Sequence, residues 1–279
     1  MSVSVPINDN LSPSICSHMF ACSTNCRPRT LGRILSAAEK RSRYFRRLIN
    51  IRHMDFEYAF WQMTQLIVAP QRLFRNFKYR NCSRRQWARD DPAFLVIMFA
   101  VVVAADSLLA TIAYHSIVSR IKFVLWSSIV DFFALTLFAS TFFWILANRF
   151  MLDQRRSPSD DILSATSETG PSDVEWAYAF DVHLNAFFPS VIIGLLRVPL
   201  FFVIISNSFV GRLIGNFLWL ISAVYYDYIT FLGFSALPQL KRTTSLLWPL
   251  TVIVLIFLLS VPLNWNFTVF LWHFYNFRV

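Results

Sequence analysis

The chain is poor in glycine and cysteine, and this limits the kinds of site that it can build. Its 279 residues include six Gly and four Cys. With so few glycines, a glycine-rich phosphate-binding loop is not expected. The cysteines (Cys16, Cys22, Cys26 and Cys82) all precede the first long apolar run, on the side that the charge pattern assigns to the cytosol. Thiols stay reduced there, so structural disulfides are not expected.

Metal-binding and catalytic motifs are also lacking. Cys16, His18, Cys22 and Cys26 form one cluster near the start of the chain, whereas zinc sites use two well-separated ligand pairs. Asp181 and His183 are two residues apart, so on a helix they would not face each other as an acid–base pair. No Ser or Cys nucleophile motif accompanies them. We therefore expect no enzymatic activity, no metal and no cofactor.

The first 30 residues lack the apolar core of a cleavable signal peptide, so we expect the first apolar run to direct the chain to a membrane. Hydrophobic residues make up 56% of the chain, and 29 of them are Phe. A helix needs about 20 apolar residues to span hydrocarbon. Five runs approach this length: Ala93–Tyr114, Phe123–Leu146, Ala186–Ile205, Leu213–Phe234 and Leu246–Leu263.

Positive charge lies almost entirely on one side of these runs. Sixteen of the 26 Lys and Arg residues precede the first run, and the two connections expected on the same side carry five more. Because short cytosolic flanks are enriched in Lys and Arg, this end faces the cytosol. We predict an all-α, polytopic membrane protein with five transmembrane helices, a cytosolic N-terminus, a luminal C-terminus and interfacial amphipathic helices.

Three regions follow from the composition. Residues 1–30 are predicted to form a disordered cytosolic tail. Residues 31–90 form a basic, aromatic region that is helical and cytosolic or interfacial. Residues 91–279 form the five-span domain, in which the loop 147–173 is flexible and rich in Ser, Asp and Pro.

The basic region carries a membrane-surface pattern next to the first span. Met54–Pro70 is apolar and aromatic but too short and too polar at its start for a span, so an interfacial helix is expected. In the following segment, aromatic residues alternate with Arg72, Arg75, Lys78 and Arg80. This mixture is typical of contact with headgroups of the anionic cytosolic leaflet. It can also stack RNA bases, which remains a weaker alternative.

Two segments that lead into apolar runs each combine a Trp with carboxylates. In both, acids near a helix start would complement the helix dipole, and Asp91 precedes a proline as a capping residue would. These segments are also candidates for contact with partners or lipid. The candidate residues are Trp87, Arg89, Asp90, Asp91, Glu175, Trp176, Asp181, His183 and Asn185.

Four ionisable residues lie inside the apolar runs: Asp106, Asp131, Arg197 and Asp227. Buried charges are costly in a membrane and usually face the interior of a helix bundle. Arg197 is therefore expected to form an ion pair with Asp131 or with Asp106 that joins helices. The alternative is a pathway for ions or protons, as in a transporter for small ions or lipids.

Long motifs along the chain closely resemble the Unc-fifty family of five-span proteins of Golgi and inner nuclear membranes. The resemblance runs from about Tyr44 to Val279, and the insert 157–171 is longer than the family pattern. The motifs are MDFEYAFWQM (54–63), APQRLFRNFKYR (69–80), QWARDDPAFLV (86–96), VEWAYAFDVHLNAFFP (174–189), GNFLWL (215–220), YITFLGFSALPQLK (228–241) and WNFT (265–268).

The resemblance implies a non-enzymatic role in Golgi membrane traffic. It implies support for cell-surface expression of assembled receptors, notably nicotinic acetylcholine receptors. It also implies recruitment of Arf guanine-nucleotide exchange factors and other trafficking machinery to the membrane. RNA binding is a weaker implication of the resemblance, and the basic aromatic segments 40–47 and 72–80 are where RNA would bind.

Overall fold

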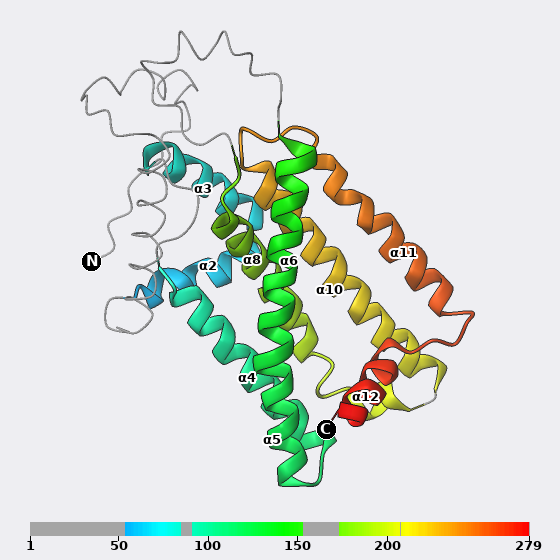
Figure 1. Cartoon of the computed structure of the whole chain (residues 1–279). Helices are drawn as coiled ribbons and strands as arrows, with labels where there is room; N and C mark the ends of the chain where they lie inside the picture. Colours follow the sequence, from blue (N-terminus) through cyan, green and yellow to red (C-terminus); the bar gives the residue numbers. More distant parts are fainter. Residues whose placement is uncertain (1–53, 85–90, 153–172, 207, 279) are drawn as a thin grey trace, which may run out of the picture.

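A computed structural model of the chain describes residues 54–84, 91–152, 173–206 and 208–278, which are mainly helical (Figure 1). The predicted N-terminal tail, the insert 157–171 and the candidates Trp87, Arg89 and Asp90 lie outside these ranges. The elements are α2 (Phe56–Val68), α3 (Pro70–Arg84), α4 (Ala93–Ala113), α5 (Ile117–Leu125), η3 (Trp126–Asp131), α6 (Phe132–Leu146), η4 (Ala147–Met151), α8 (Trp176–Leu195), α9 (Phe201–Ile205), α10 (Phe209–Ser235), η5 (Thr243–Leu247), α11 (Trp248–Ser260) and α12 (Phe267–Arg278).

Five helical segments are long and apolar enough to cross a membrane, which confirms the predicted number of spans. They are Ala93–Ala113, Ile117–Met151, Trp176–Leu195, Phe209–Ser235 and Thr243–Ser260. The second span is continuous from α5 to η4 and includes the two π-helical stretches η3 and η4. At 1.5 Å per residue its 35 residues measure about 52 Å, so it must tilt or extend beyond a hydrocarbon core of about 30 Å.

The expected limits of the third span were wrong. The helix α8 begins at Trp176, ten residues before the start of the apolar run, and it ends at Leu195. Residues 196–200 form turns before the short helix α9. A proline at position 199 lacks the amide donor that a continuing helix would need. In this added part of α8, His183 and Asn185 are buried and form hydrogen bonds to Tyr226 and Gln62.

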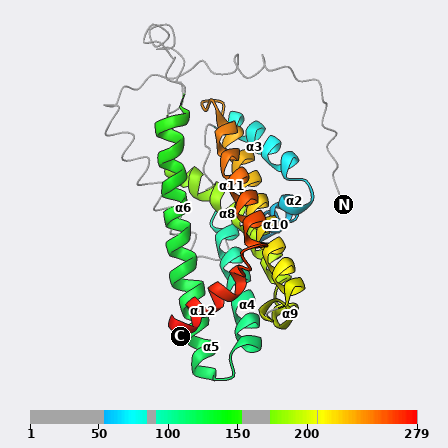
Figure 2. The same cartoon turned by 90° about the vertical axis from the view of Figure 1, so that its right-hand side faces the viewer.

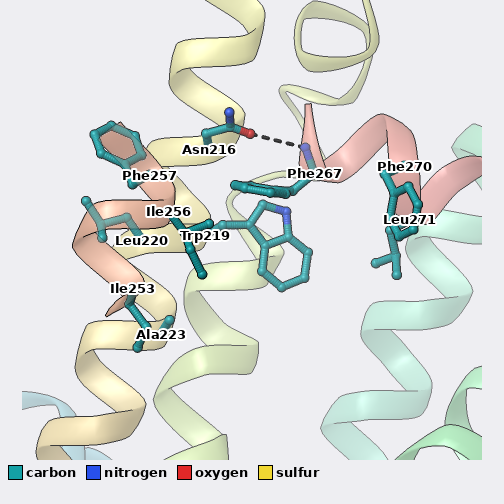
Figure 3. Close-up of a pocket in the computed structure, with 10 residues that line it drawn as sticks. All are labelled: Asn216, Trp219, Leu220, Ala223, Ile253, Ile256, Phe257, Phe267, Phe270 and Leu271. Atoms are coloured by element: carbon teal, nitrogen blue, oxygen red, sulfur yellow. Dashed lines mark hydrogen bonds between the residues drawn. The ribbon is translucent and has the colours of Figure 1, made fainter. Parts of the chain in front are cut away.

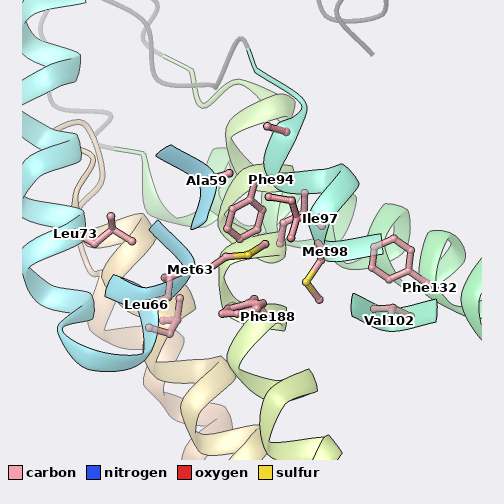
Figure 4. Close-up of a cluster of buried hydrophobic side chains, with 14 of the residues drawn as sticks. Ala59, Met63, Leu66, Leu73, Phe94, Ile97, Met98, Val102, Phe132 and Phe188 are labelled. Carbon is pink, nitrogen blue, oxygen red and sulfur yellow. The ribbon is translucent and has the colours of Figure 1, made fainter. Parts of the chain in front are cut away.

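The helices α8 and α10 form the centre of the bundle. They approach closely at Gly233, where an added Cβ would lie 2.6 Å from Cγ1 of Val182. One hydrophobic core joins α2, α3, α4 and α8 and includes Leu66, Met98 and Phe188 (Figure 4). A second core, which includes Tyr178 and Phe234, lies where η4, α8 and α10 meet. Much of α6 and α11 stays exposed, as expected for helices that face lipid.

The two ends of the bundle carry different elements. Helix α3 lies at the end where α6 finishes and α11 begins, whereas α5, α9 and α12 lie at the opposite end (Figures 1 and 2). Helix α3 and the C-terminal helix α12 therefore lie toward opposite ends of the bundle. An odd number of spans requires this separation.

Candidate functional site

Helices α2 and α3 form a helical hairpin against the bundle, and Ala69 lies between them. Pro70 begins α3, a position where its fixed backbone is favourable. Since proline has no amide hydrogen, the carbonyl of Leu66 cannot accept the usual bond from the fourth residue along the chain. The hydroxyl of Tyr225 on α10 donates to this carbonyl at 2.9 Å and to that of Ile67 at 3.2 Å. A distant helix therefore satisfies the end of α2.

Side-chain hydrogen bonds and apolar burial fix the hairpin to α8 and α10. The amide of Gln62 donates to Oδ1 of Asn185 at 2.9 Å, and both side chains are buried. On α3, the amide of Gln71 donates to the hydroxyl of Tyr228 at 2.8 Å. The inner face of α2 also buries Met63 and Leu66 in the first core. These contacts join the hairpin to the bundle as one packed unit.

The opposite face of α2 exposes large apolar side chains. These are Phe60, Trp61, Ile67 and Val68, and Val68 retains 74% of its accessible surface. An exposed apolar patch on a helix beside five spans is suited to insertion among lipid tails near the headgroups. One face of α2 is therefore apolar and exposed while the other is buried, and the interfacial location of this helix stays a prediction.

Helix α3 has one cationic and one apolar face. Arg72 and Arg75 are exposed, whereas Leu73 and Phe74 are buried against the bundle. Because Phe74 is only 4% exposed, it cannot stack on a base, and the pattern seen in sequence does not form an aromatic platform there. Lys78 and Arg80 lie within α3, but their side chains are outside the described part of the chain. We call the exposed residues of both helices (Phe60, Trp61, Ile67, Val68, Arg72 and Arg75) the hairpin surface.

Asp91 connects the hairpin to the first span. One carboxylate oxygen accepts the backbone amide of Asp55 at 2.8 Å, and the other accepts that of Ala93 at 3.1 Å. Asp91 thus accepts the amide of the first residue of α4, which has no partner within the helix, although Pro92 and not Asp91 directly precedes the helix. This carboxylate also fixes the start of α2 to the start of α4, a role that the sequence did not indicate.

The residues predicted for contact on α8 have different environments. Glu175 and Asp181 are half-buried, and Trp176 is exposed and donates through Nε1 to Thr141 at 3.2 Å. His183 and Asn185 are buried, and Nδ1 of His183 lies 2.8 Å from the hydroxyl of Tyr226. The expectation that these two residues contact a partner or lipid is therefore wrong. Their polar side chains point into the bundle, where their hydrogen bonds join α8 to α2 and α10.

The ionisable residues within the bundle form a different network from the expected one. Asp131 accepts a hydrogen bond from Arg278 at 3.0 Å and one from the hydroxyl of Tyr275 at 2.8 Å. Asp106 accepts from Ser128 at 2.7 Å. The guanidinium of Arg197 instead lies 3.8 Å from the ring centroid of Trp219. The predicted pairing of Arg197 with Asp131 or Asp106 is wrong.

The partner of Asp131 could not be identified from the spans because it lies beyond the last of them. Arg278 is 147 residues away, at the end of α12, which follows the fifth span. Burial raises the pKa of Tyr275 on the same helix, and its hydrogen bond to the carboxylate raises it further. Asp227 is also buried, and its Oδ2 has no hydrogen-bond partner among the described residues.

Within the described ranges, no group of three or more His, Cys, Asp or Glu side chains could hold a metal ion. The Cys and His cluster near the start of the chain lies outside these ranges. The polar interactions of the described bundle instead join helices to one another, and the hairpin surface combines exposed apolar side chains with exposed cations.

Comparison with known proteins connects this architecture to one family. The UNC-50 family model matches residues 44–276. The "Protein unc-50 homolog" of Bos taurus is 44% identical over 247 residues, which cover 88% of this chain and 90% of that protein. The homologs of Homo sapiens and Drosophila melanogaster are 43% and 40% identical, over 90% and 85% of their lengths. No solved structure matches the chain.

Proposed function

The chain belongs to the UNC-50 family, whose members are non-enzymatic multi-pass membrane proteins, and we propose on this premise that it is a Golgi membrane trafficking factor. In this role it recruits Arf guanine-nucleotide exchange factors to the cytosolic face and supports surface expression of assembled receptors of the nicotinic acetylcholine type. The inner nuclear membrane is a second proposed location. The N-terminus and the hairpin surface face the cytosol in this proposal.

The observation that carries the proposal is the hairpin surface, which combines an apolar patch with exposed cations. Phe60 and Val68 are suited to the lipid boundary, and Arg72 and Arg75 stand beside them on the next helix. Anionic lipid of the cytosolic leaflet attracts such cations at about 1 kcal/mol each. A peripheral protein that binds both lipid and this surface would therefore be held at the membrane.

The hydrogen bonds that join the hairpin to Tyr225, Tyr228 and Asn185 explain why such a surface would be effective as a recruitment platform. A partner loses affinity when it must order the surface that it binds. Since the hairpin is already packed against α8 and α10, that cost is reduced. The five spans then serve to anchor the platform in one membrane.

The transporter alternative has less support. Asp131 is bound by Arg278 and Tyr275, and Asp106 is bound by Ser128. Asp227 lies on α10, 18 residues after Phe209, the first residue of that helix. An RNA-binding role is also less favoured, because Leu73 and Phe74 pack inward.

The proposal is tested by proximity labelling from a tag at the N-terminus of the full chain in cells. The test variant combines Arg72→Gln with Arg75→Gln, which removes two exposed cations from the hairpin surface. The control combines Lys241→Gln with Arg242→Asn, which removes two exposed cations after α10. Asn is chosen there because Arg242 has a left-handed backbone with φ of 63°.

We expect the unaltered chain and the control to label Arf exchange factors and coat proteins at the Golgi. The test variant should reach the same membrane but lose most of that labelling. Equal loss in both variants would indicate a general charge effect and contradict the assignment to the hairpin. If the unaltered chain resides at the Golgi but labels neither Arf exchange factors nor coat proteins, the recruitment role itself is contradicted.

A further inference from the structure

A cavity of about 320 Å³ lies between α10, α11 and α12, near the end of the bundle that carries the C-terminal helix (Figure 3). Its walls are almost entirely apolar and include Trp219, Ile253, Phe257, Phe267 and Leu271. The volume falls at the lower end of the range for small-molecule sites, roughly 300 to 1,000 Å³. The cavity is therefore large enough for part of a ligand.

The two polar side-chain groups of the wall, the amide of Asn216 and the indole N–H of Trp219, already have partners. Nε1 of Trp219 donates to Oγ1 of Thr268 at 3.2 Å. Nδ2 of Asn216 donates to Oγ of Ser260 at 3.0 Å and to the carbonyl of Trp265 at 2.8 Å, and its Oδ1 accepts from the amide of Phe267 at 3.2 Å. A buried water needs two to four polar partners, and this wall offers none. Hydrocarbon is the chemistry that fits the wall.

The surroundings of the cavity indicate where that hydrocarbon comes from. Both α10 and α11 are membrane spans, and the outer face of α11 is exposed at Val252, Leu255 and Leu259. On α12, Phe270 retains 74% of its accessible surface at the rim. A cavity that opens between lipid-facing helices meets acyl chains directly. If it stayed empty, the lining atoms would lose dispersion contacts.

Two cations, Arg212 and Arg197, lie next to the cavity. They give it a preference for a charged lipid, which a purely apolar gap between helices would lack. Arg212, Asn216 and Trp219 are spaced i, i+4 and i+7, so they lie on one face of α10. Arg212 donates to Oδ1 of Asn264, in the connection between α11 and α12, at 2.9 Å. Arg197 lies over the ring of Trp219, and its Nε is buried without a hydrogen-bond partner among the described residues.

Acidic residues are scarce in the sequence around Arg197 and Arg212. The sequence has no Asp or Glu between Asp181 and Asp227, and none after Asp227. Asp227 is 15 residues from Arg212 on the same helix, about 22 Å along the axis. Asp131 is already bound by Arg278. An anion from outside the chain would therefore meet a positive potential at this rim.

We propose that this cavity binds one acyl chain of an anionic phospholipid, whose phosphate group is held at Arg212 beside the positive charge of Arg197. The lipid belongs to the leaflet on the side of α12. The cavity uses none of the residues of the hairpin surface, so this proposal goes beyond the proposed recruitment function and can be tested independently of it.

The experiment uses the full chain in nanodiscs that contain a phospholipid with a photoactivatable acyl chain, either phosphatidic acid or phosphatidylcholine. Labelled peptides are mapped by mass spectrometry. We expect phosphatidic acid to label α10, α11 and α12 more strongly than it labels α6, and phosphatidylcholine to show little such preference. Arg212→Gln should reduce the preference for phosphatidic acid by about tenfold, the loss expected for one charge-assisted contact.

Ala223→Trp places a large side chain into the cavity, because Ala223 lines it. Leu135→Trp is the matched control, since Leu135 is 57% exposed on α6, away from the cavity. Size-exclusion and circular dichroism profiles like those of the unaltered chain establish that both variants fold. The proposal expects cavity labelling to fall in the first variant and to persist in the control.

Several results would overturn the proposal. Unchanged labelling in a folded Ala223→Trp variant would assign the signal to ordinary boundary lipid. Equal labelling by phosphatidic acid and phosphatidylcholine would contradict the proposal that Arg212 selects an anionic phospholipid. A crosslink in cells from residues of the cavity to another polypeptide, in place of lipid, would assign the surface to a protein partner.

Discussion

The hydroxyl of Tyr225 lies 2.9 Å from the carbonyl oxygen of Leu66, although 159 residues separate them in the chain. The bond forms where Pro70 deprives that carbonyl of its usual helical donor. In a membrane, an unsatisfied backbone group costs several kcal/mol. This hydrogen bond therefore avoids a large loss of stability at the end of α2. It connects the end of α2 to the central helix α10 and so determines where the hairpin surface is held.

Tyr225→Phe should loosen the hairpin. The change removes the donor to the carbonyls of Leu66 and Ile67 while keeping the ring. A buried acceptor left without a partner costs about 1 to 3 kcal/mol. We expect unfolding in detergent to shift accordingly and amide hydrogen exchange in α2 and α3 to become faster, while exchange in α11 stays the same.

Tyr228→Phe is the comparison for that experiment. Its hydroxyl accepts a bond from Gln71, which is exposed, so water can replace the lost partner. Its effect on exchange in α2 and α3 should be clearly smaller. Equal effects of the two variants would show that the carbonyl at the end of α2 has no special role.

Gln62 and Asn185 should show strong energetic coupling. Both are buried, and Gln62→Leu would leave Oδ1 of Asn185 without its donor. We expect each single change to leucine to lower the free energy of unfolding by about 1 to 3 kcal/mol, and the double change to cost less than the sum. A double-mutant cycle on the purified protein measures this. Additive effects would mean that the pair does not hold α2 against α8.

Gly233→Ala should disrupt the closest approach of α8 and α10. The added Cβ would lie 2.6 Å and 2.8 Å from the two methyl groups of Val182. Overpacking of this kind costs about 1 to 3 kcal/mol. At Gly194, a Cβ would meet no atom within 4 Å, so Gly194→Ala serves as the control and should not destabilise the bundle. Thermal unfolding in detergent compares the two, and adding Val182→Ala should recover part of the loss.

Tyr275 should make stability sensitive to alkaline pH. Because burial raises its pKa in the folded chain, the unfolded chain loses this proton first, near the ordinary tyrosine pKa of about 10. The contribution of Tyr275 is therefore complete below that pH and declines as pH rises above it. We expect the unaltered chain to melt at a higher temperature than Tyr275→Phe at about pH 8, with the gap narrowing toward about pH 11. A gap that stays constant over this range would rule out the assigned linkage.

The membrane-crossing helices could be predicted because hydrocarbon solvent imposes a simple rule. A membrane-crossing helix must be long and apolar, so four of the five runs overlap the observed helices, with limits that differ by at most six residues. For the run that begins at Ala186, the predicted start of the span was ten residues too late, because α8 begins at Trp176. Composition could not show that the polar residues before it, including His183 and Asn185, are enclosed by α2 and α10. Their partners, Gln62 and Tyr226, lie on helices distant in sequence.

The chain by itself determined that there are five membrane helices, that an amphipathic segment precedes them and that the positive charge lies mostly at one end. These properties depend on local composition, because hydrocarbon accepts only segments that are long and apolar enough. Only the tertiary structure decided that Asp131 meets Arg278, that Tyr225 meets Leu66 and that a cavity remains beside Asn216. Such pairings depend on which helix faces pack together, and a single charged residue in an apolar run does not specify its partner.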